Sequence, residues 1–157
     1  MIDFLLATGD WAIARALRGS GALYATVNAA HILGLALLVG AILPLDLRIA
    51  GGFRSVALAD LARVLRPAAA LGLGLATLTG ALLFTVNPAD YIANPAFRLK
   101  LLLLLLALAN LIAIERSPAF RRALAGQAPG TALRAGALAS ALLWIGTLLA
   151  GRWIGFL

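Results

Sequence analysis

The sequence predicts an all-α integral membrane protein, in which a four-helix bundle follows a short amphipathic helix lying in the membrane interface. Of the 157 residues, 63% are hydrophobic and only 12% are charged, and the mean hydropathy is +1.01. Soluble domains normally contain about a quarter charged residues. The chain also has four apolar runs, each close to the roughly 20 residues that a helix needs to cross the hydrocarbon core. These observations place it in the membrane class.

The N-terminal segment, residues 1–20, is expected to form an interfacial helix over residues 2–18. One face of this helix would carry Ile2, Leu6, Ile13 and Leu17, and the other Asp3, Asp10 and Arg18. Trp11 suits the level of the lipid head groups. Gly19, Ser20 and Gly21 would then turn the chain into the membrane.

The remaining residues, 21–157, are expected to form the bundle, with spans at about 22–45, 67–86, 95–114 and 133–154. Pro44 and Asp46 would mark the exit of the first span, and Pro67 would occupy the first turn of the second. Asn94 would cap the third span, with Pro95 at its first helical position. The short connection between the second and third spans predicts that these two pack as antiparallel neighbours.

The basic residues predict the orientation of the spans. The two loops on one side hold Arg48, Arg54, Arg63, Arg66, Arg116, Arg121, Arg122 and Arg134, whereas the other side holds Arg15, Arg18, Arg98, Lys100 and Arg152. Cytoplasmic loops carry the excess of Lys and Arg. Both termini are therefore expected on the non-cytoplasmic side.

Several classes of function are disfavoured. Net charge is +7, but the arginines stand singly or in pairs at the ends of apolar runs, so nucleic acid is not expected as a partner, and membrane lipids are. The chain has no cysteine and one histidine, which argues against a protein-only zinc site. It shows no nucleophile–base pair, no phosphate-binding motif and no intramembrane carboxylate relay, so an enzyme or a proton-coupled transporter is not expected.

His31 is the most informative residue, because a polar ring deep in a span usually has a partner or a function. Tyr24, Asn28 and His31 are spaced four and three residues apart and share one helical face. On one interpretation, His31 is structural and bonds to Asn28 or to a polar group on a neighbouring helix. On the other, it binds haem iron or hydrogen-bonds to a quinone.

Three cations are expected in the same half of the bundle as His31, namely Arg98, Lys100 and Arg152. A tetrapyrrole would use a nitrogen for its iron and cations for its propionates. The alternative is that the cations reach the head groups, with Lys100 extending its stem to the surface.

Two stripes of small residues predict close helix packing. One is Gly72, Ala76 and Gly80, and the other is Gly136, Ser140, Trp144, Thr147 and Gly151. Thr77 and Thr79 are expected to bond back to their own helix. At the other end of the bundle, Asp46 and Glu115 are expected to pair at the surface with Arg48 and Arg116.

Three segments resemble a family of small bacterial four-span membrane proteins classed as a domain of unknown function. They are Asn28–Gly34 leading to Leu45–Arg48, Asn94–Lys100, and Ala150–Ile154. The resemblance covers nearly the whole chain and implies a location in the bacterial inner membrane. Members often carry a second histidine near the end of the third span, where this chain has Glu115, so the resemblance does not favour a bis-histidine haem within one chain. More loosely, His31 with Lys100 is similar to the copper-resistance D proteins and to the haem-containing membrane protoporphyrinogen oxidases.

The sequence leaves two candidate functions. The first is a non-enzymatic accessory or structural subunit, packed against other membrane subunits or against copies of itself. The second is a b-type haem or quinone protein of electron transfer that uses His31. A small-molecule transporter or copper importer is less favoured, because the chain has one methionine and no thiol.

Overall fold

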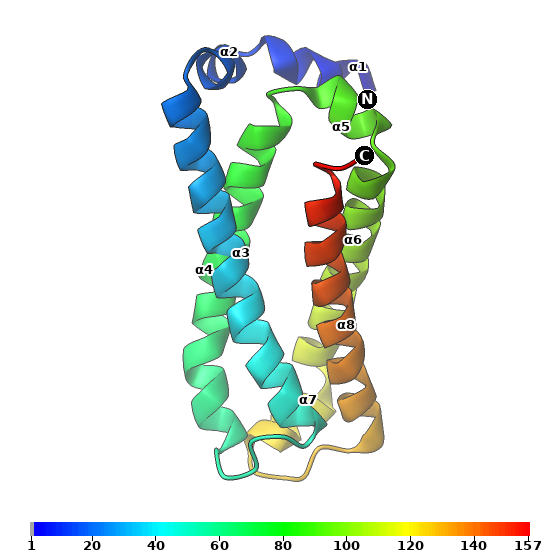
Figure 1. The fold of residues 1–157 in the computed structure, drawn as a ribbon. Helices are drawn as coiled ribbons and strands as arrows, with labels where there is room; N and C mark the ends of the chain where they lie inside the picture. The colour runs from blue at the N-terminus through cyan, green and yellow to red at the C-terminus, as the bar shows by residue number, and fades with distance from the viewer. Residues whose placement is uncertain (1) are drawn as a thin grey trace.

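The computed structural model describes residues 2–157, and within them the chain is helical with no strand. Four helices are long and apolar enough to cross a membrane: α3 (Gly21–Ala50), α4 (Leu58–Phe84), α6 (Pro95–Arg116) and α8 (Thr131–Trp153). They form a bundle, with short helices at both of its ends (Figure 1). The predicted fold class, a four-helix membrane bundle, is confirmed.

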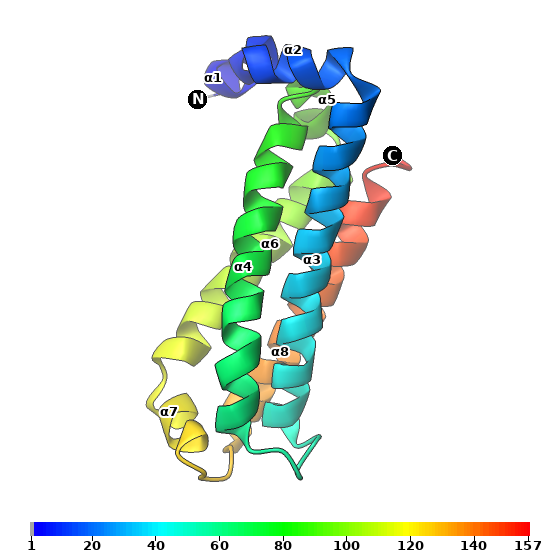
Figure 2. The same ribbon diagram turned by 90° about the vertical axis from the view of Figure 1, so that its left-hand side faces the viewer.

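The N-terminal segment is broken rather than the single helix that was predicted over residues 2–18. It consists of α1 (Ile2–Ala7), a 3-10 turn, η1 (Thr8–Asp10), and α2 (Ala12–Gly19). The break falls where Gly9 and Asp10 are poor helix formers and Trp11 is extended, with ψ 151°. Arg18 then fixes α2 by donating to the carbonyls of Gly9 and Val86. Figure 2 shows α1 and α2 lying across one end of the bundle, here called the α2 end.

The first two spanning helices are longer than predicted. α3 begins at Gly21, where the Oγ of Ser20 accepts from the N–H of Leu23, and it continues through Pro44 to a left-handed Gly51. α4 begins nine residues before the predicted start, so Pro67 lies inside it. A proline in a membrane helix removes one backbone donor and leaves one carbonyl without its partner. Groups on neighbouring helices or a local change of helix geometry can satisfy that carbonyl, so the helix continues. Proline therefore did not mark either boundary.

The last two spanning helices have bounds close to those predicted. Asn94 caps α6 by accepting from the N–H groups of Ala96 and Phe97, with Pro95 as the first helical residue, as predicted. The connection before it forms a further short helix, α5 (Pro88–Ala93). Another unpredicted helix, α7 (Pro118–Leu124), follows α6 and is capped by Ser117. Figure 1 places α7 at the opposite end of the bundle from α2, here called the α7 end.

The closest helix pair is α3 with α4, and α8 packs against both α6 and α3. Gly34 and Gly72 bring the backbones of α3 and α4 into contact, since a Cβ at Gly34 would lie 2.6 Å from the nitrogen of Ala76. The stripe of small residues on the second span therefore has the predicted packing role. The second and third spans are antiparallel neighbours, as predicted, because Phe84 of α4 stacks on Phe97 of α6 and Arg66 of α4 pairs with Glu115 of α6. Their backbones are less closely packed than those of α6 and α8, so the main partner of α6 is α8.

The two carboxylates at the α7 end do not have the predicted partners. Asp46 is only 5% exposed and faces Ser140 of α8, with Oδ2 unpaired, so it is not a surface residue. Its place on the inward face of α3 follows from the continuation of that helix beyond Pro44. Glu115 pairs with Arg66 of α4, which donates from both Nε and Nη2, and the Nε–Oε1 distance is 2.9 Å. These contacts tie α3 to α8 and α4 to α6 at this end.

Candidate ligand cleft between α3 and α8

A cleft of about 700 Å³ lies between α3 and α8 in the half of the bundle nearer the α2 end. Its polar lining residues are Tyr24, Asn28 and His31 from α3, Tyr91 from α5, and Thr147 and Arg152 from α8. Figure 1 shows α3 and α8 diverging toward this end, at which both termini lie. Most of the other lining residues are apolar, so the cleft is an apolar cavity with a few convergent polar groups, the usual form of a small-molecule site.

His31 is bound across the closest helix interface rather than to its own helix. Its Nδ1 lies 3.1 Å from Oγ1 of Thr79 in α4, and the ring packs on Gly80, where a Cβ would lie 3.0 Å from Cε1. Gly80 thus supplies the room that the imidazole occupies. Thr79 is therefore the polar partner on a neighbouring helix that one interpretation of His31 predicted.

The bonds of Thr79 decide which nitrogen of a neutral His31 carries the proton. The Thr79 hydroxyl lies 2.6 Å from the carbonyl of Leu75 and donates its one hydrogen there, as predicted for bonding back to the helix. With that hydrogen on the Leu75 bond, the Thr79 oxygen accepts from His31, which assigns the proton of a neutral ring to Nδ1. Nε2 consequently keeps a free lone pair. This is the arrangement that a metal-binding histidine usually has, with the other ring nitrogen donating to a fixed acceptor.

Lys100 of α6 lies against Gly151 of α8, a residue that lines the cleft. A Cβ built on Gly151 would lie 3.5 Å from Cε and 3.6 Å from Nζ of Lys100, so the lysine stem lies against this glycine. Within residues 2–157 the Lys100 ammonium forms no ion pair. Lys100 is therefore an unpaired cation close to the cleft.

The two predicted arginines differ in position. Arg152 lines the cleft, with its guanidinium 4.7 Å from the ring centre of Phe156. Arg98 is exposed, donates to the carbonyl of Ala93 and does not line the cleft. The structure thus brings Tyr24, Asn28, His31 and Arg152 together, places Lys100 against Gly151, and leaves Arg98 outside.

Tyr91 was missed from the sequence as a residue of the cleft. It lies against Phe84 and Phe97, with ring centres 6.0 Å and 5.3 Å away. Burial raises the pKa of the Tyr91 phenol above its ordinary value, and nearby Tyr24 raises that pKa further. The phenol is therefore protonated and able to donate a hydrogen bond. Only its place in a short connection at the same end as Tyr24 could have indicated this role.

Within residues 2–157 no cluster of three or more His, Cys, Asp or Glu side chains could hold a metal ion. No protein-family model, curated protein or solved structure matches the chain. The chemistry of the cleft is therefore the basis for assigning a function. It offers the imidazole of His31, two phenols and an amide for polar contacts, and the guanidinium of Arg152 for an acidic group, with Lys100 nearby. These groups suit an amphipathic, lipid-soluble ligand that carries a negative charge.

Proposed function

We propose that this membrane protein binds a b-type haem in the cleft between α3 and α8, with Nε2 of His31 as an axial ligand to the iron. The observation that carries the proposal is the 3.1 Å contact between Nδ1 of His31 and Thr79, from which we assign the free lone pair to Nε2. A haem bound there would supply one-electron transfer.

The residues in and around the cleft suit a haem in three respects. Thr79 holds the His31 ring in one orientation, and Gly80 gives it room. Arg152 lines the cleft, and Lys100 adds a second positive charge that no carboxylate of the described chain neutralises. Charge-assisted bonds from such cations are the usual partners of carboxylates like the haem propionates. The apolar lining side chains would contact the porphyrin ring.

A quinone is the other ligand that we consider for this cleft. A neutral His31 with its proton on Nδ1 accepts at Nε2 but cannot donate there, so it would bind a quinol hydroxyl rather than a quinone carbonyl. This asymmetry favours haem over an oxidised quinone.

The test is the absorption spectrum of the full chain, purified in a mild detergent from cells supplied with a haem precursor. We expect a Soret band in the wild type, its loss in His31→Ala, and no change in Thr26→Ala. Thr26 is a matched control, because it is a polar residue of α3 that bonds only to the carbonyl of Ala22 and does not line the cleft. Thr79→Val should lower haem affinity about 10- to 100-fold, as the loss of an outer partner of a metal ligand does.

No Soret band in haem-supplied protein, or a band unchanged in His31→Ala, would overturn the haem proposal. A quinone extracted from the wild type but not from His31→Ala would assign the cleft to that ligand instead.

An accessory or structural role is a second candidate, compatible with the first, and it is favoured by α6. Only 6% of its most apolar stretch is buried in the bundle, against 22–33% for the other three spanning helices. Its exposed side chains include Leu101, Leu102, Leu105 and Leu106. A second membrane helix could pack along them. Purification without crosslinking should then yield a copurifying subunit or a homo-oligomer, and a monodisperse single chain would exclude this role.

A further inference from the structure

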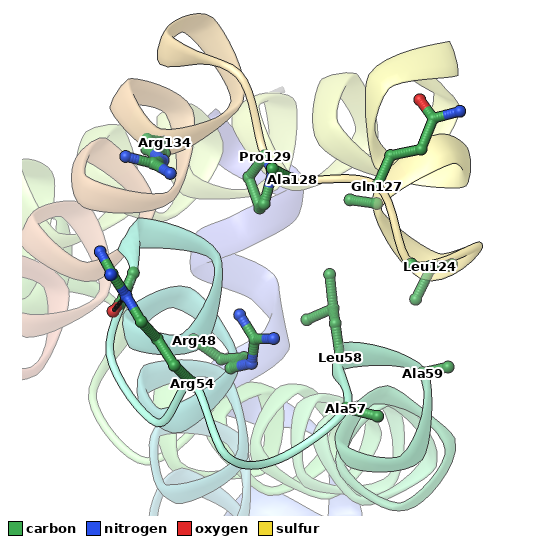
Figure 3. Close-up of a pocket in the computed structure, with 13 residues that line it drawn as sticks. Arg48, Arg54, Ala57, Leu58, Ala59, Leu124, Gln127, Ala128, Pro129 and Arg134 are labelled. Atoms are coloured by element: carbon green, nitrogen blue, oxygen red, sulfur yellow. Dashed lines mark hydrogen bonds between the residues drawn. The ribbon is translucent and has the colours of Figure 1, made fainter.

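A second pocket, at the α7 end, carries three arginines and no acidic residue. Its volume is about 550 Å³, and it is lined by the end of α3, the loop that follows, the start of α4, the connection from α7 to α8, and the first turn of α8. Arg48, Arg54 and Arg134 come from three of these segments. Figure 3 shows these arginines on one side of the pocket and Leu58, Ala59 and Leu124 on the other.

Two of the arginines are held in place through Nε, which leaves their terminal nitrogens free. The Nε of Arg48 donates to the carbonyl of Val56 over 2.6 Å, and the Nε of Arg54 donates to the carbonyl of Gly51 over 3.0 Å. Gly51 is in the left-handed region, with φ 118°, and so ends α3 and aims this carbonyl at the loop. Fixed guanidinium groups lose little freedom when they bind an anion.

The third arginine has a buried donor with no partner. The Nε of Arg134 is enclosed and makes no hydrogen bond within residues 2–157. A buried donor left unpaired costs free energy, especially on a charged group. The two ion pairs of the described chain, Asp60–Arg63 and Arg66–Glu115, do not involve the pocket arginines. Three positive charges therefore line the pocket without a compensating carboxylate.

The start of α8 adds to the positive potential of the pocket. Its N-cap, Gly130, provides no side-chain cap, and the preceding Ala128 and Pro129 line the pocket. The first N–H groups of a helix and its dipole attract anions. A guanidinium group can donate two parallel hydrogen bonds to two oxygens of one phosphate.

We infer that this pocket binds a phosphate group, held by Arg48, Arg54 and Arg134. The phosphate belongs either to the head group of an anionic phospholipid or to a free phosphate anion. The apolar wall and the position at the end of the spanning helices suit the lipid. The site is independent of the haem cleft, which lies at the other end of the bundle.

The experiment measures thermal unfolding of the full chain in a neutral detergent, with one addition at a time. The additions are phosphatidylglycerol, phosphatidylcholine and inorganic phosphate. A ligand that binds only the folded state raises the midpoint as its concentration increases. We expect phosphatidylglycerol to raise it and phosphatidylcholine not to, and we expect the effect to weaken as salt is added.

Arg134→Gln and Arg54→Gln should each weaken the apparent affinity about tenfold or more, because each removes charge-assisted bonds. Arg122→Gln is the matched control, since Arg122 is an exposed arginine at the same end that does not line the pocket. Should Arg134→Gln fail to fold, Arg54→Gln still tests the site, because Arg54 lies in an exposed loop.

A shift with inorganic phosphate alone that Arg134→Gln or Arg54→Gln abolishes would support the site and identify a free anion as its ligand. No shift with either phosphate source would overturn the inference. So would an equal loss in Arg122→Gln and Arg54→Gln, since that would show general attraction to a basic surface.

Discussion

Substituting Gly72 with alanine should separate α3 from α4 and destabilise the bundle. A Cβ at Gly72 would lie 2.5 Å from the nitrogen of Leu38, 2.8 Å from the carbonyl oxygen of Gly34 and 2.9 Å from Cβ of Leu37. Two of these atoms are backbone, so no change of rotamer removes the clash. Raising the shortest contact to 3.4 Å, where ordinary van der Waals contact begins, requires the helices to separate locally by about 0.9 Å.

The magnitude follows from what that separation does to the closest helix interface. A gap of about 0.5–1 Å loses a quarter to a half of each dispersion contact, and overpacking costs about 1–3 kcal/mol. Since the clash lies between the backbones of both helices, we expect Gly72→Ala to lower the free energy of unfolding by about 3 kcal/mol. The same separation should lengthen the 3.1 Å His31–Thr79 contact, which crosses the same interface.

The assay is reversible unfolding in mixed micelles with an increasing fraction of denaturing detergent, followed by circular dichroism. Gly74→Ala is the matched control, because Gly74 lies on the same helix and a Cβ there would have no atom within 4 Å. Alanine favours a helix over glycine by up to about 1 kcal/mol, so this control should be neutral or stabilising. Equal stabilities for the two variants would refute the proposed close contact of α3 and α4.

Three further predictions concern other parts of the molecule. Trp144 is 1% exposed, so Trp144→Ala should cost about 3–5 kcal/mol in the same assay; a cost below about 1 kcal/mol, the level of a surface change, would contradict its core position. Asn94→Ala should cost about 1 kcal/mol, because it removes the cap of α6; unchanged stability would show that the cap is dispensable. In Tyr24→Phe, which leaves Tyr91 as the one tyrosine, burial should still raise the pKa of Tyr91 above about 10, the ordinary value. Stability should then fall as the pH rises past that value, since the unfolded chain loses the proton first; phenolate absorbance appearing at or below pH 10 would contradict this.

The spanning helices could be predicted from the sequence because lipid imposes a simple requirement on them. A run of about 20 apolar residues must be helical to satisfy its backbone, whatever its neighbours are. The cap at Asn94 could also be predicted from the sequence, since it depends only on adjacent residues. Helix ends outside the hydrocarbon, such as the start of α4 before Pro67, depend on packing at the α7 end and could not be predicted from the sequence.

The grouping of the polar residues of α3 was predictable from the sequence, but the contacts that they make with other helices were not. The four- and three-residue spacings put Tyr24, Asn28 and His31 on one face, and the structure places all three in one cleft. The partner Thr79 lies 48 residues from His31 in the chain, and helical spacing carries no information at that range. Asp46 was misjudged for the same reason, because the residue that it faces, Ser140, lies on another helix.

The packing of α6 mainly on α8 sets the order in which the membrane protein can assemble during its synthesis. α3 and α4 are consecutive, so this hairpin can complete its glycine contact as soon as both have entered the lipid. α6 follows them but must wait for α8 before it gains its main partner. Newly made chains that stop before residue 131 would therefore contain the complete α3–α4 hairpin and a leucine-rich α6 that contacts α4 near its two ends, and α8 would then pack against both α3 and α6.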